Sequence, residues 1–209
     1  AMIDSRSHDI AVIGATGYTG KRIVRELVAA GHRVLAVGRD RGRLEQATQG
    51  LPVTVEVAEL DDRSRLLELC GRVTTVVNAA GSFVYTSAPI ATAAIAAKTH
   101  YVDISGEQRA VADVFDRFDA PAAAAEVAVV PSAAFYAALA DVLVALAVTE
   151  LGGTGEIGVE EIDIAYDITE WTPSGAAYAN MLRGVGRPVI QYDRGFVEVT
   201  ALRRRSVDF

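Results

Sequence analysis

The chain has 209 residues, of which 51% are hydrophobic and 22% are charged, and its formal net charge at pH 7 is −7. This length accommodates one full domain and part of another, and the hydrophobic content excludes a disordered chain. The acidic balance disfavours nucleic acid as a partner, because a surface that follows phosphates needs clustered Lys and Arg. The single cysteine, Cys70, excludes a disulfide framework, and we expect it to be a buried thiol.

The sequence has no pattern typical of membrane insertion or of a metal site. Charged residues interrupt the first ten positions, so no signal peptide is predicted. The longest apolar run, around residues 133–148, contains Asp141 and much alanine, which favours a buried helix over a membrane span. The three histidines are isolated from one another along the chain. We therefore expect a cytoplasmic protein with no membrane contact and no metal.

In chain order, the first predicted elements are a strand, a glycine-rich turn and a helix. The strand Ile10–Ile13 is followed by an amphipathic helix that ends near Ala30. Glycines permit a tight turn and close approach of a ligand, and the helix N-terminus offers free N–H groups to a pyrophosphate. This context predicts a dinucleotide-binding turn rather than an ordinary one. Its residues are Gly14, Ala15, Thr16, Gly17, Tyr18, Thr19 and Gly20.

The second predicted strand, Val34–Val37, indicates which dinucleotide binds. NAD-binding units carry an acidic residue about 20 positions past the glycines, where it binds the ribose hydroxyl. Gly38 stands near that position, and Arg39 offers a planar fork suited to a 2′-phosphate, with Arg41 or Arg43 able to add charge. We predict NADP(H) as the cofactor. The alternative is a solvated basic turn that opens the next helix.

The first part continues with short runs rich in β-branched and apolar residues, and strands that are apolar rather than alternating indicate burial on both faces. These runs are Val53–Val57, Thr75–Val77, Tyr101–Ile104 and Val127–Val130, and the helix-length segments between and after them are Asp62–Leu69, Ala88–Ala97, Gln108–Glu126 and Ala137–Leu151. This alternation predicts an α/β fold, a Rossmann-like doubly wound parallel sheet.

Ligands of such sheets bind beyond the carboxyl ends of the strands. Further cofactor contacts are therefore expected at the turns that follow the third and fourth strands, although each could be an ordinary strand-to-helix turn. The residues are Glu59, Leu60, Asn78, Ala79, Ala80, Gly81 and Ser82.

The composition changes at Gly152–Gly155, where a second domain is predicted to begin. Polar and apolar residues alternate over Val159–Ile168, a helix is expected over Gly175–Arg183, and a hairpin over Val189–Leu202 turns at Asp193–Gly195. These features predict part of a mainly antiparallel α+β domain. We expect an NADP-binding domain over residues 8–151 and a partial substrate or dimerisation domain over 156–209. A thin sheet leaves a free edge, so we expect the chain to continue past Phe209 or to form a homodimer through this sheet.

The segment Tyr101-Val102-Asp103-Ile104-Ser105-Gly106-Glu107 resembles the Tyr-x-Asp-x-x-Gly-Glu segment of saccharopine dehydrogenase-like proteins. The glycine turn and the Gly38-Arg39 pair are also similar to that family, and the resemblance covers about residues 9–151. It implies an NADP-dependent oxidoreductase, or a relative such as a trans-acting enoyl reductase. The leading prediction is reduction of a small or carrier-linked substrate at a C=N, C=O or C=C bond.

Two departures from the family pattern concern the substrate side of the site. Members often carry Gly-Pro-Phe after the fourth strand, where this chain has Gly81-Ser82-Phe83. Many carry Gly-Phe-Asp after the sixth, where this chain reads Ala134-Phe135-Tyr136-Ala137. The family's substrate is therefore not carried over.

A reductase commonly needs a proton donor, and the short-chain dehydrogenase pattern of Tyr followed four residues later by Lys is absent. The candidates near the predicted strand ends are Tyr85, Asp103, Glu107 and Tyr136. Asp103 and Glu107 could instead hold the following turn and cap the next helix.

Because no catalytic signature is present, a non-catalytic NADP(H)-sensing regulator similar to NmrA-like proteins is the alternative function. A third reading is a chain that binds cofactor but is inactive because its second domain is incomplete.

Overall fold

Six parallel strands form the central sheet of the computed structural model, which describes residues 6–150, 164, 166, 172–173, 175–185, 188–192 and 196–199. The strand order is β3-β2-β1-β4-β5-β6, and every neighbouring pair is parallel. The order reverses at β1, which lies between β2 and β4, as in a doubly wound sheet. The predicted Rossmann-like fold is confirmed. The strands are β1 (Ile10–Ile13), β2 (Val34–Gly38), β3 (Thr54–Val57), β4 (Thr75–Asn78), β5 (His100–Asp103) and β6 (Val129–Val130).

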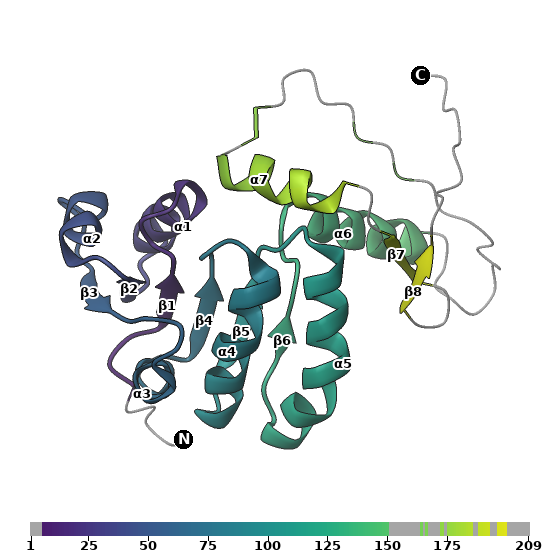
Figure 1. Ribbon diagram of the computed structural model, residues 1–209. Coiled ribbons are helices and arrows are strands. Elements are labelled where there is room, and N and C mark those ends of the chain that lie inside the picture. Colours follow the sequence, from purple (N-terminus) through teal and green to yellow (C-terminus); the bar gives the residue numbers. More distant parts are fainter. Residues whose placement is uncertain are drawn as a thin grey trace.

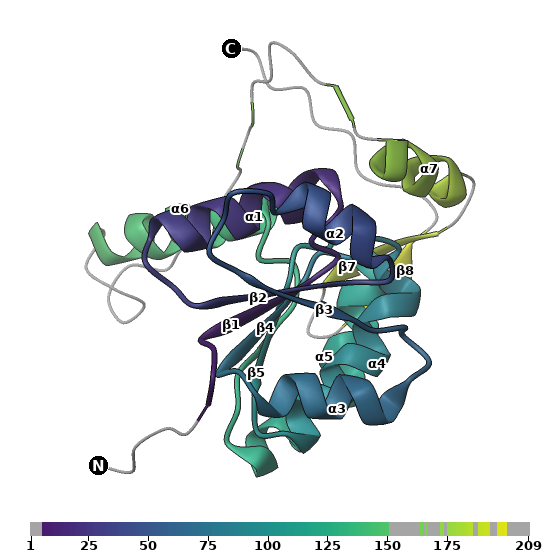
Figure 2. The ribbon, with the colours of Figure 1, turned by 90° about the vertical axis from the view of Figure 1, so that its left-hand side faces the viewer.

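Helices cover both faces of the sheet (Figures 1 and 2). One hydrophobic cluster joins the sheet to α1 and α2, and a larger one joins it to α3, α4 and α5. Within β1, Val12 belongs to the first cluster and Ala11 and Ile13 to the second, which explains why the strand is apolar at every position. The helices are α1 (Tyr18–Ala29), α2 (Arg41–Ala47), α3 (Arg63–Gly71), α4 (Phe83–Ala96), α5 (Gln108–Ala125) and α6 (Phe135–Glu150).

Helix α4 corrects one boundary of the sequence analysis. A helix was expected over Ala88–Ala97, whereas α4 begins at Phe83 and contains Pro89 in its interior. A proline near the start of an apolar segment favours a helix that opens beside it, because proline fits the first helical turn. The additional turn is capped by Glu107, which is 24 residues away in sequence and gives no local signal. As a consequence, Tyr85 lies in the first turn of α4.

After α6, the described residues include helix α7 (Gly175–Gly184) and the antiparallel strands β7 (Val189–Tyr192) and β8 (Phe196–Val199). These elements agree with the helix and hairpin expected there. Of the strand expected over residues 159–168, only Ile164 and Tyr166 are described, and the turn at 193–195 lies outside the described residues. In both ribbon views α7 lies on the side of the sheet where the strands have their carboxyl ends (Figures 1 and 2).

An ion-pair network joins the edge strand β3 to α3. Glu56 of β3 pairs with Arg65 at 2.5 Å and with Arg72 at 2.7 Å, and Arg65 also pairs with Glu68 at 2.6 Å. The hydrogen bond from Arg72, together with the charge of Arg65, lowers the pKa of Glu56 below its ordinary value of 4.5, although burial acts in the opposite direction. The ionised form of Glu56 is therefore favoured by folding.

We predict that Glu56→Gln lowers the unfolding free energy at pH 7 by about 1 kcal/mol. A carboxyl group whose pKa is depressed by folding stabilises the fold above its unfolded pKa, and this contribution is lost as the pH falls through the folded pKa. Urea titrations between pH 7 and pH 3 should therefore show the wild type and the variant converging at low pH. Asp113→Asn, which breaks the exposed pair with Arg117, is the control and should cost less than about 0.5 kcal/mol.

Candidate functional site

The glycine turn lies at the carboxyl end of β1, in direct contact with the turn that follows β4. Gly14 has a φ of +90°, and a Cβ atom there would lie 2.6 Å from the Ala79 carbonyl group and from the Ala80 Cα. A Cβ at Gly20 would overlap the Gly14 carbonyl oxygen. The first contact places two backbone loops against each other at the point where the strand order reverses. Dinucleotides bind at this point in open α/β sheets.

Helix α1 begins at this turn with its N-terminus open to an anion. Its N-cap is Gly17, which provides no side-chain cap. Side chains cap three other helices: Asp40 caps α2, Asp62 caps α3, and Glu107 caps α4. Because the first N–H groups of a helix lack intrahelical partners, α1 offers donors and a positive dipole end to a pyrophosphate.

The residues predicted to select a 2′-phosphate, Gly38 and Arg39, lie at the end of β2. A Cβ at Gly38 would lie 3.1 Å from the Leu44 side chain, so a carboxylate at position 38 would crowd α2. Arg39 is exposed directly after the strand, and its neighbour Asp40 is turned into the N-cap of α2, where it accepts a hydrogen bond from the Arg43 backbone N–H at 2.9 Å. Arg39 therefore exposes a positive charge next to the carboxyl end of β2.

Beyond β3, the two residues expected near the adenine differ in exposure. Glu59 is exposed, and its carbonyl oxygen accepts a hydrogen bond from the Asp62 N–H at 3.3 Å. Leu60 is partly buried and packs against the larger hydrophobic cluster. Leu60 thus holds this turn against the body of the domain, while Glu59 and Asp61 expose polar side chains at its surface.

A buried polar network lies at the carboxyl ends of β4 and β5. The Asn78 Nδ2 donates to Thr86 Oγ1 at 3.1 Å and to the Tyr101 hydroxyl at 3.2 Å, while Asn78 Oδ1 accepts from the Ala80 N–H at 3.1 Å. The Tyr101 hydroxyl donates to Asp103 Oδ2 at 2.7 Å, and burial raises the pKa of Tyr101, so this hydroxyl remains a donor. Asn78 therefore fixes the turn that contacts the glycine loop.

Asp103 extends this network to the loop after β6. Its side chain is fully buried and accepts four hydrogen bonds: Oδ2 from Tyr101 and Ser87, and Oδ1 from the N–H groups of Ser105 and Ser132. The Ser132 hydroxyl donates to the Ser105 carbonyl oxygen at 2.7 Å. The Asp103 carboxylate is thereby saturated with donors from three segments and holds the loops that follow β5 and β6 together.

Glu107 joins the loop after β5 to the start of α4. Its Oε1 accepts from the Phe83 N–H at 3.0 Å and its Oε2 from the Val84 N–H at 3.2 Å. A carboxylate is favoured at this position by the helix dipole. The preceding residues Gly81 and Ser82 both have left-handed backbone conformations, with φ of +69° and +48°. Proline cannot adopt the φ of Ser82, which is consistent with the departure from Gly-Pro-Phe noted in the sequence.

The four candidate proton donors fall into two groups. Asp103 is fully buried, and Glu107 binds backbone N–H groups, as described above. Tyr85 in α4 and Tyr136 in α6 have 73% and 48% of their surface exposed. The Tyr136 ring makes an edge-to-face contact with Tyr166 at 5.4 Å between centroids, and its carbonyl oxygen accepts from the Tyr166 hydroxyl. The two exposed tyrosines are thus the candidates whose hydroxyl groups can be approached from solvent.

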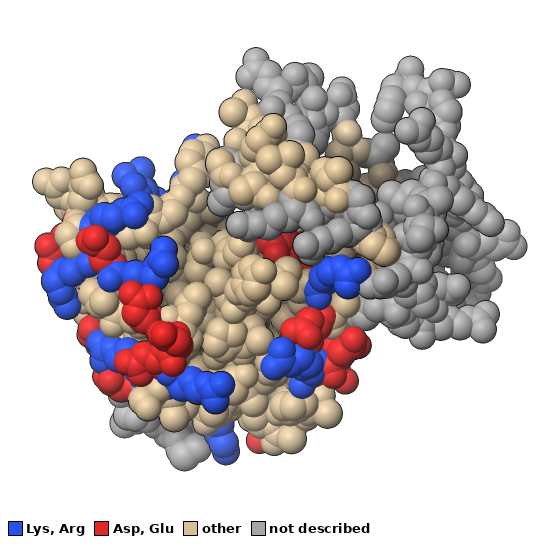
Figure 3. Space-filling model, viewed as in Figure 1, with Lys and Arg blue, Asp and Glu red and all other residues tan. Residues whose placement is uncertain are grey.

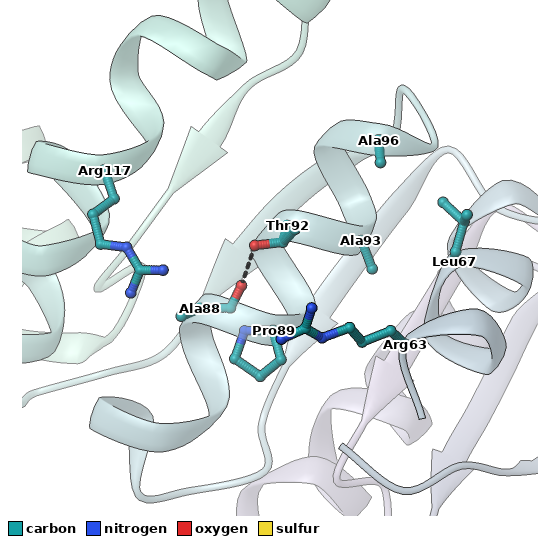
Figure 4. Close-up of a pocket in the computed structure, with 8 residues that line it drawn as sticks. All are labelled: Arg63, Leu67, Ala88, Pro89, Thr92, Ala93, Ala96 and Arg117. Carbon is teal, nitrogen blue, oxygen red and sulfur yellow. Dashed lines mark hydrogen bonds between the residues drawn. The ribbon is translucent and has the colours of Figure 1, made fainter. Parts of the chain in front are cut away.

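A separate pocket of about 490 Å³ lies on the outer face of α4 (Figure 4). Helix α4 contains no charged residue, and the uncharged strip over it is bordered by side chains of both signs (Figure 3). None of the predicted site residues lines this pocket, whose walls are formed by Arg63, Leu67, Ala88, Pro89, Thr92, Ala93, Ala96 and Arg117. The cofactor site proposed from the strand ends is therefore not this pocket.

Two further features concern metals and membranes. In the part of the chain that the structure describes, no three His, Cys, Asp or Glu side chains are grouped so that they could hold a metal ion. No helix of that part has the length and apolarity needed to cross a membrane. Cys70 is buried, as expected, and burial raises the pKa of its thiol to about 12.

Sequence reasoning did not select Tyr101, Thr86, Ser87, Ser105 or Ser132 as individual members of the site. Tyr101 had a usable signal, because it stands two residues before Asp103 on one strand and both side chains must point to the same face. Thr86, Ser87 and Ser132 had no signal, since their contacts with Asn78 or Asp103 come from segments that the fold brings together. Ser105 lies two residues after Asp103 and binds it through the backbone N–H.

The parallel sheet, the glycine turn and the open N-terminus of α1 define a dinucleotide-binding Rossmann domain. Residues 10–130 match the model of the saccharopine dehydrogenase NADP binding domain, and the chain belongs to this family. Its cofactor is accordingly NADP(H).

Two relatives show the range of proteins that share this domain. The chain is 29% identical over 130 residues to an Arabidopsis thaliana protein named "Probable mitochondrial saccharopine dehydrogenase-like oxidoreductase", a match that covers 53% of this chain and 29% of the relative. It is 31% identical over 127 residues to a candidate trans-acting enoyl reductase of Mycobacterium tuberculosis, which covers 56% of this chain and 30% of the relative. The matched region is thus less than a third of each relative.

A solved structure has the same fold. Saccharopine dehydrogenase (L-Glu forming) of Saccharomyces cerevisiae, in apo form, superposes with a TM-score of 0.60 at 14% identity, over 70% of this chain and 32% of that one. At this identity the likeness supports the Rossmann-like architecture and no more.

We predict that Gly14→Ala disrupts the site. The added methyl group would lie 2.6 Å from backbone atoms of Ala79 and Ala80, and the φ of +90° is unfavourable for alanine. The expected result is a loss of at least about 2 kcal/mol of stability, measured by thermal unfolding, together with loss of NADPH binding. Gly71→Ala is the control, because nothing lies within 4 Å of a Cβ at this helical position, and it should leave both properties intact.

Ser105 yields a second prediction, because its buried hydroxyl has no hydrogen-bond partner among the described residues. A buried unpaired hydroxyl is unfavourable by about 1–3 kcal/mol, so Ser105→Ala should unfold at the same or a higher denaturant concentration than the wild type. Ser132→Ala, which removes a hydroxyl bonded to the Ser105 carbonyl oxygen, should instead destabilise the protein. A destabilised Ser105→Ala would mean that the hydroxyl does form a bond.

Proposed function

We propose that this chain is the cofactor-binding part of an NADP(H)-dependent oxidoreductase that reduces a small or carrier-linked substrate at a C=N, C=O or C=C bond. The observation that carries the proposal is the contact of Gly14 with Ala79 and Ala80 beside the open N-terminus of α1. This arrangement leaves backbone N–H groups available at the switch point, where a pyrophosphate is bound in folds of this class.

The residues along the carboxyl edge have separate roles in this proposal. The N–H groups at the start of α1, with Gly17 at the N-cap, bind the pyrophosphate. Arg39 binds the 2′-phosphate as a bidentate donor, and Gly38 places no carboxylate there that would repel the phosphate. Glu59 and Leu60 border the adenine, and Ala79 and Ala80 allow the nicotinamide ribose to pass close to the backbone. When bound, NADPH supplies the hydride of the reduction.

The protein must also orient the substrate and supply a proton. We propose Tyr85 and Tyr136 as the donors to test first, because both hydroxyl groups lie on residues that are exposed near strand ends. Asp103 and Glu107 are occupied by hydrogen bonds and hold loops instead. The name of the mycobacterial relative makes an enoyl group the first C=C substrate to test.

The region after α6 is proposed as part of a substrate or dimerisation domain, with the boundary between residues 151 and 156. The described strands β7 and β8 pair with each other as a two-stranded sheet, and such a sheet presents edges that another chain can cover. A homodimer through this sheet and a cytoplasmic location remain our expectations.

A non-catalytic NADP(H) sensor is the second candidate function. This function is favoured because Asp103 and Glu107 both accept hydrogen bonds from neighbouring groups. Two of the four candidate proton donors could therefore deliver a proton only by breaking those bonds. Turnover separates the two functions. Oxidation of NADPH by imine, carbonyl or enoyl substrates supports the oxidoreductase, whereas tight binding without turnover supports the sensor.

The first test is a titration of the purified chain with NADPH and NADH, followed by nicotinamide fluorescence and by calorimetry. Tight binding of NADPH with much weaker binding of NADH supports the proposal. Binding of neither dinucleotide would overturn it for this chain.

We predict that Arg39→Ala weakens NADPH binding about 10- to 100-fold and leaves NADH binding nearly unchanged, because a charge-assisted contact contributes about 1.5–3 kcal/mol. Arg117→Ala is the control, since Arg117 lies at the separate pocket on α4. An unchanged ratio of the two affinities in Arg39→Ala would show that another group selects the cofactor.

A further inference from the structure

We infer that Tyr101, Asp103 and Glu107 are positioning residues that hold the segment 79–84 in the conformation that receives the cofactor. The inference deepens the proposed function and rests on it. These residues act through Asn78 and through the N-terminus of α4, and they need not touch the cofactor themselves.

The Tyr101 hydroxyl is the centre of the network. It donates to Asp103 Oδ2 at 2.7 Å and accepts from Asn78 Nδ2 at 3.2 Å, so the carboxylate orients the hydroxyl and the hydroxyl orients the amide. The Asn78 amide then presents its oxygen to the Ala80 N–H at 3.1 Å. If the amide were reversed, its NH₂ group would face that N–H and the bond would be lost.

The second anchor lies at the other end of the segment. Glu107 binds the N–H groups of Phe83 and Val84, and between the two anchors Gly81 and Ser82 have left-handed backbones. A left-handed conformation is unfavourable for a residue such as serine. Ser82 therefore does not adopt this conformation through local preference, and the bonds at the two ends of the segment maintain it.

The position of segment 79–84 matters because the backbone of Ala79 and Ala80 lies directly against Gly14 of the glycine turn. A Cβ at Gly14 would lie 2.6 Å from Ala79 and Ala80, so a small movement of this turn toward β1 would collide with Gly14. A movement away would widen the site beside the α1 N-terminus. Cofactor affinity should consequently depend on the Tyr101 hydroxyl even though the hydroxyl is buried.

The test compares two variants that each remove one buried hydroxyl from neighbouring parts of the chain. Tyr101→Phe removes the centre of the network and keeps the ring. Thr99→Val removes a hydroxyl that bonds the Cys70 carbonyl oxygen at 2.7 Å, outside this network, and is the structural control. The readouts are NADPH affinity, hydrogen exchange of the amides in segment 79–84, and unfolding free energy.

We expect Tyr101→Phe to weaken NADPH binding about 5- to 10-fold, the effect of one hydrogen bond, and to accelerate exchange in segment 79–84. Thr99→Val should lower stability without either effect. Should Tyr101→Phe fold poorly, Glu107→Gln serves as the second variant with the same expected pattern.

Unchanged exchange in segment 79–84 would overturn the inference, and so would faster exchange with NADPH affinity within twofold of the wild type. Equal loss of affinity in Thr99→Val would also overturn it, because the effect would then follow general destabilisation. If the wild type binds neither dinucleotide, the proposed function fails separately, and hydrogen exchange still decides whether the network holds the segment.

Discussion

The contact between the turn after β1 and the turn after β4 is the constraint on which the rest of the site depends. Gly14 meets Ala79 and Ala80 with no room for a Cβ atom, so two loops from different halves of the sheet share one position. Parallel pairing of β1 with β4 brings the two turns to the same edge, in a register that sets Ile13 beside Asn78. Helix α1 starts next to this junction, and its residue Gly20 packs against the Gly14 carbonyl group.

Polar groups, rather than apolar packing, hold the carboxyl edge of β4 and β5 in place. Hydrophobic contacts tolerate small displacements, whereas a buried carboxylate with four donors does not, because each lost partner leaves a desolvated charge. Asp103 therefore specifies the positions of Tyr101, Ser87, Ser105 and Ser132 more narrowly than an apolar residue could. The apolar clusters support the sheet, and this network specifies the loops that a ligand meets.

Much of the sheet was predictable because its strands are short apolar runs that helices bury on both sides. Strand β1 was placed with its observed bounds, and the glycine turn was recognised from its flanks. The start of α4 and the distant partners of Asp103 were not predictable, since Glu107, Ser87 and Ser132 act across 16 to 29 positions of sequence. Periodicity reports which face of an element is buried, but it carries no information on which distant side chain will complete a cap.

The cap on α4 also affects how the domain folds. The residues just before α4 provide no side-chain cap, and both Gly81 and Ser82 have left-handed backbones. The N–H groups of Phe83 and Val84 therefore gain a side-chain partner only when Glu107, which follows β5, is in place. During synthesis, the chain up to residue 106 contains the whole of α4 but lacks Glu107, whose carboxylate binds the free N–H groups of the first turn. The stability of the first turn of α4 is therefore coupled to the residue that follows β5, and through it to the pairing of β5 with β4.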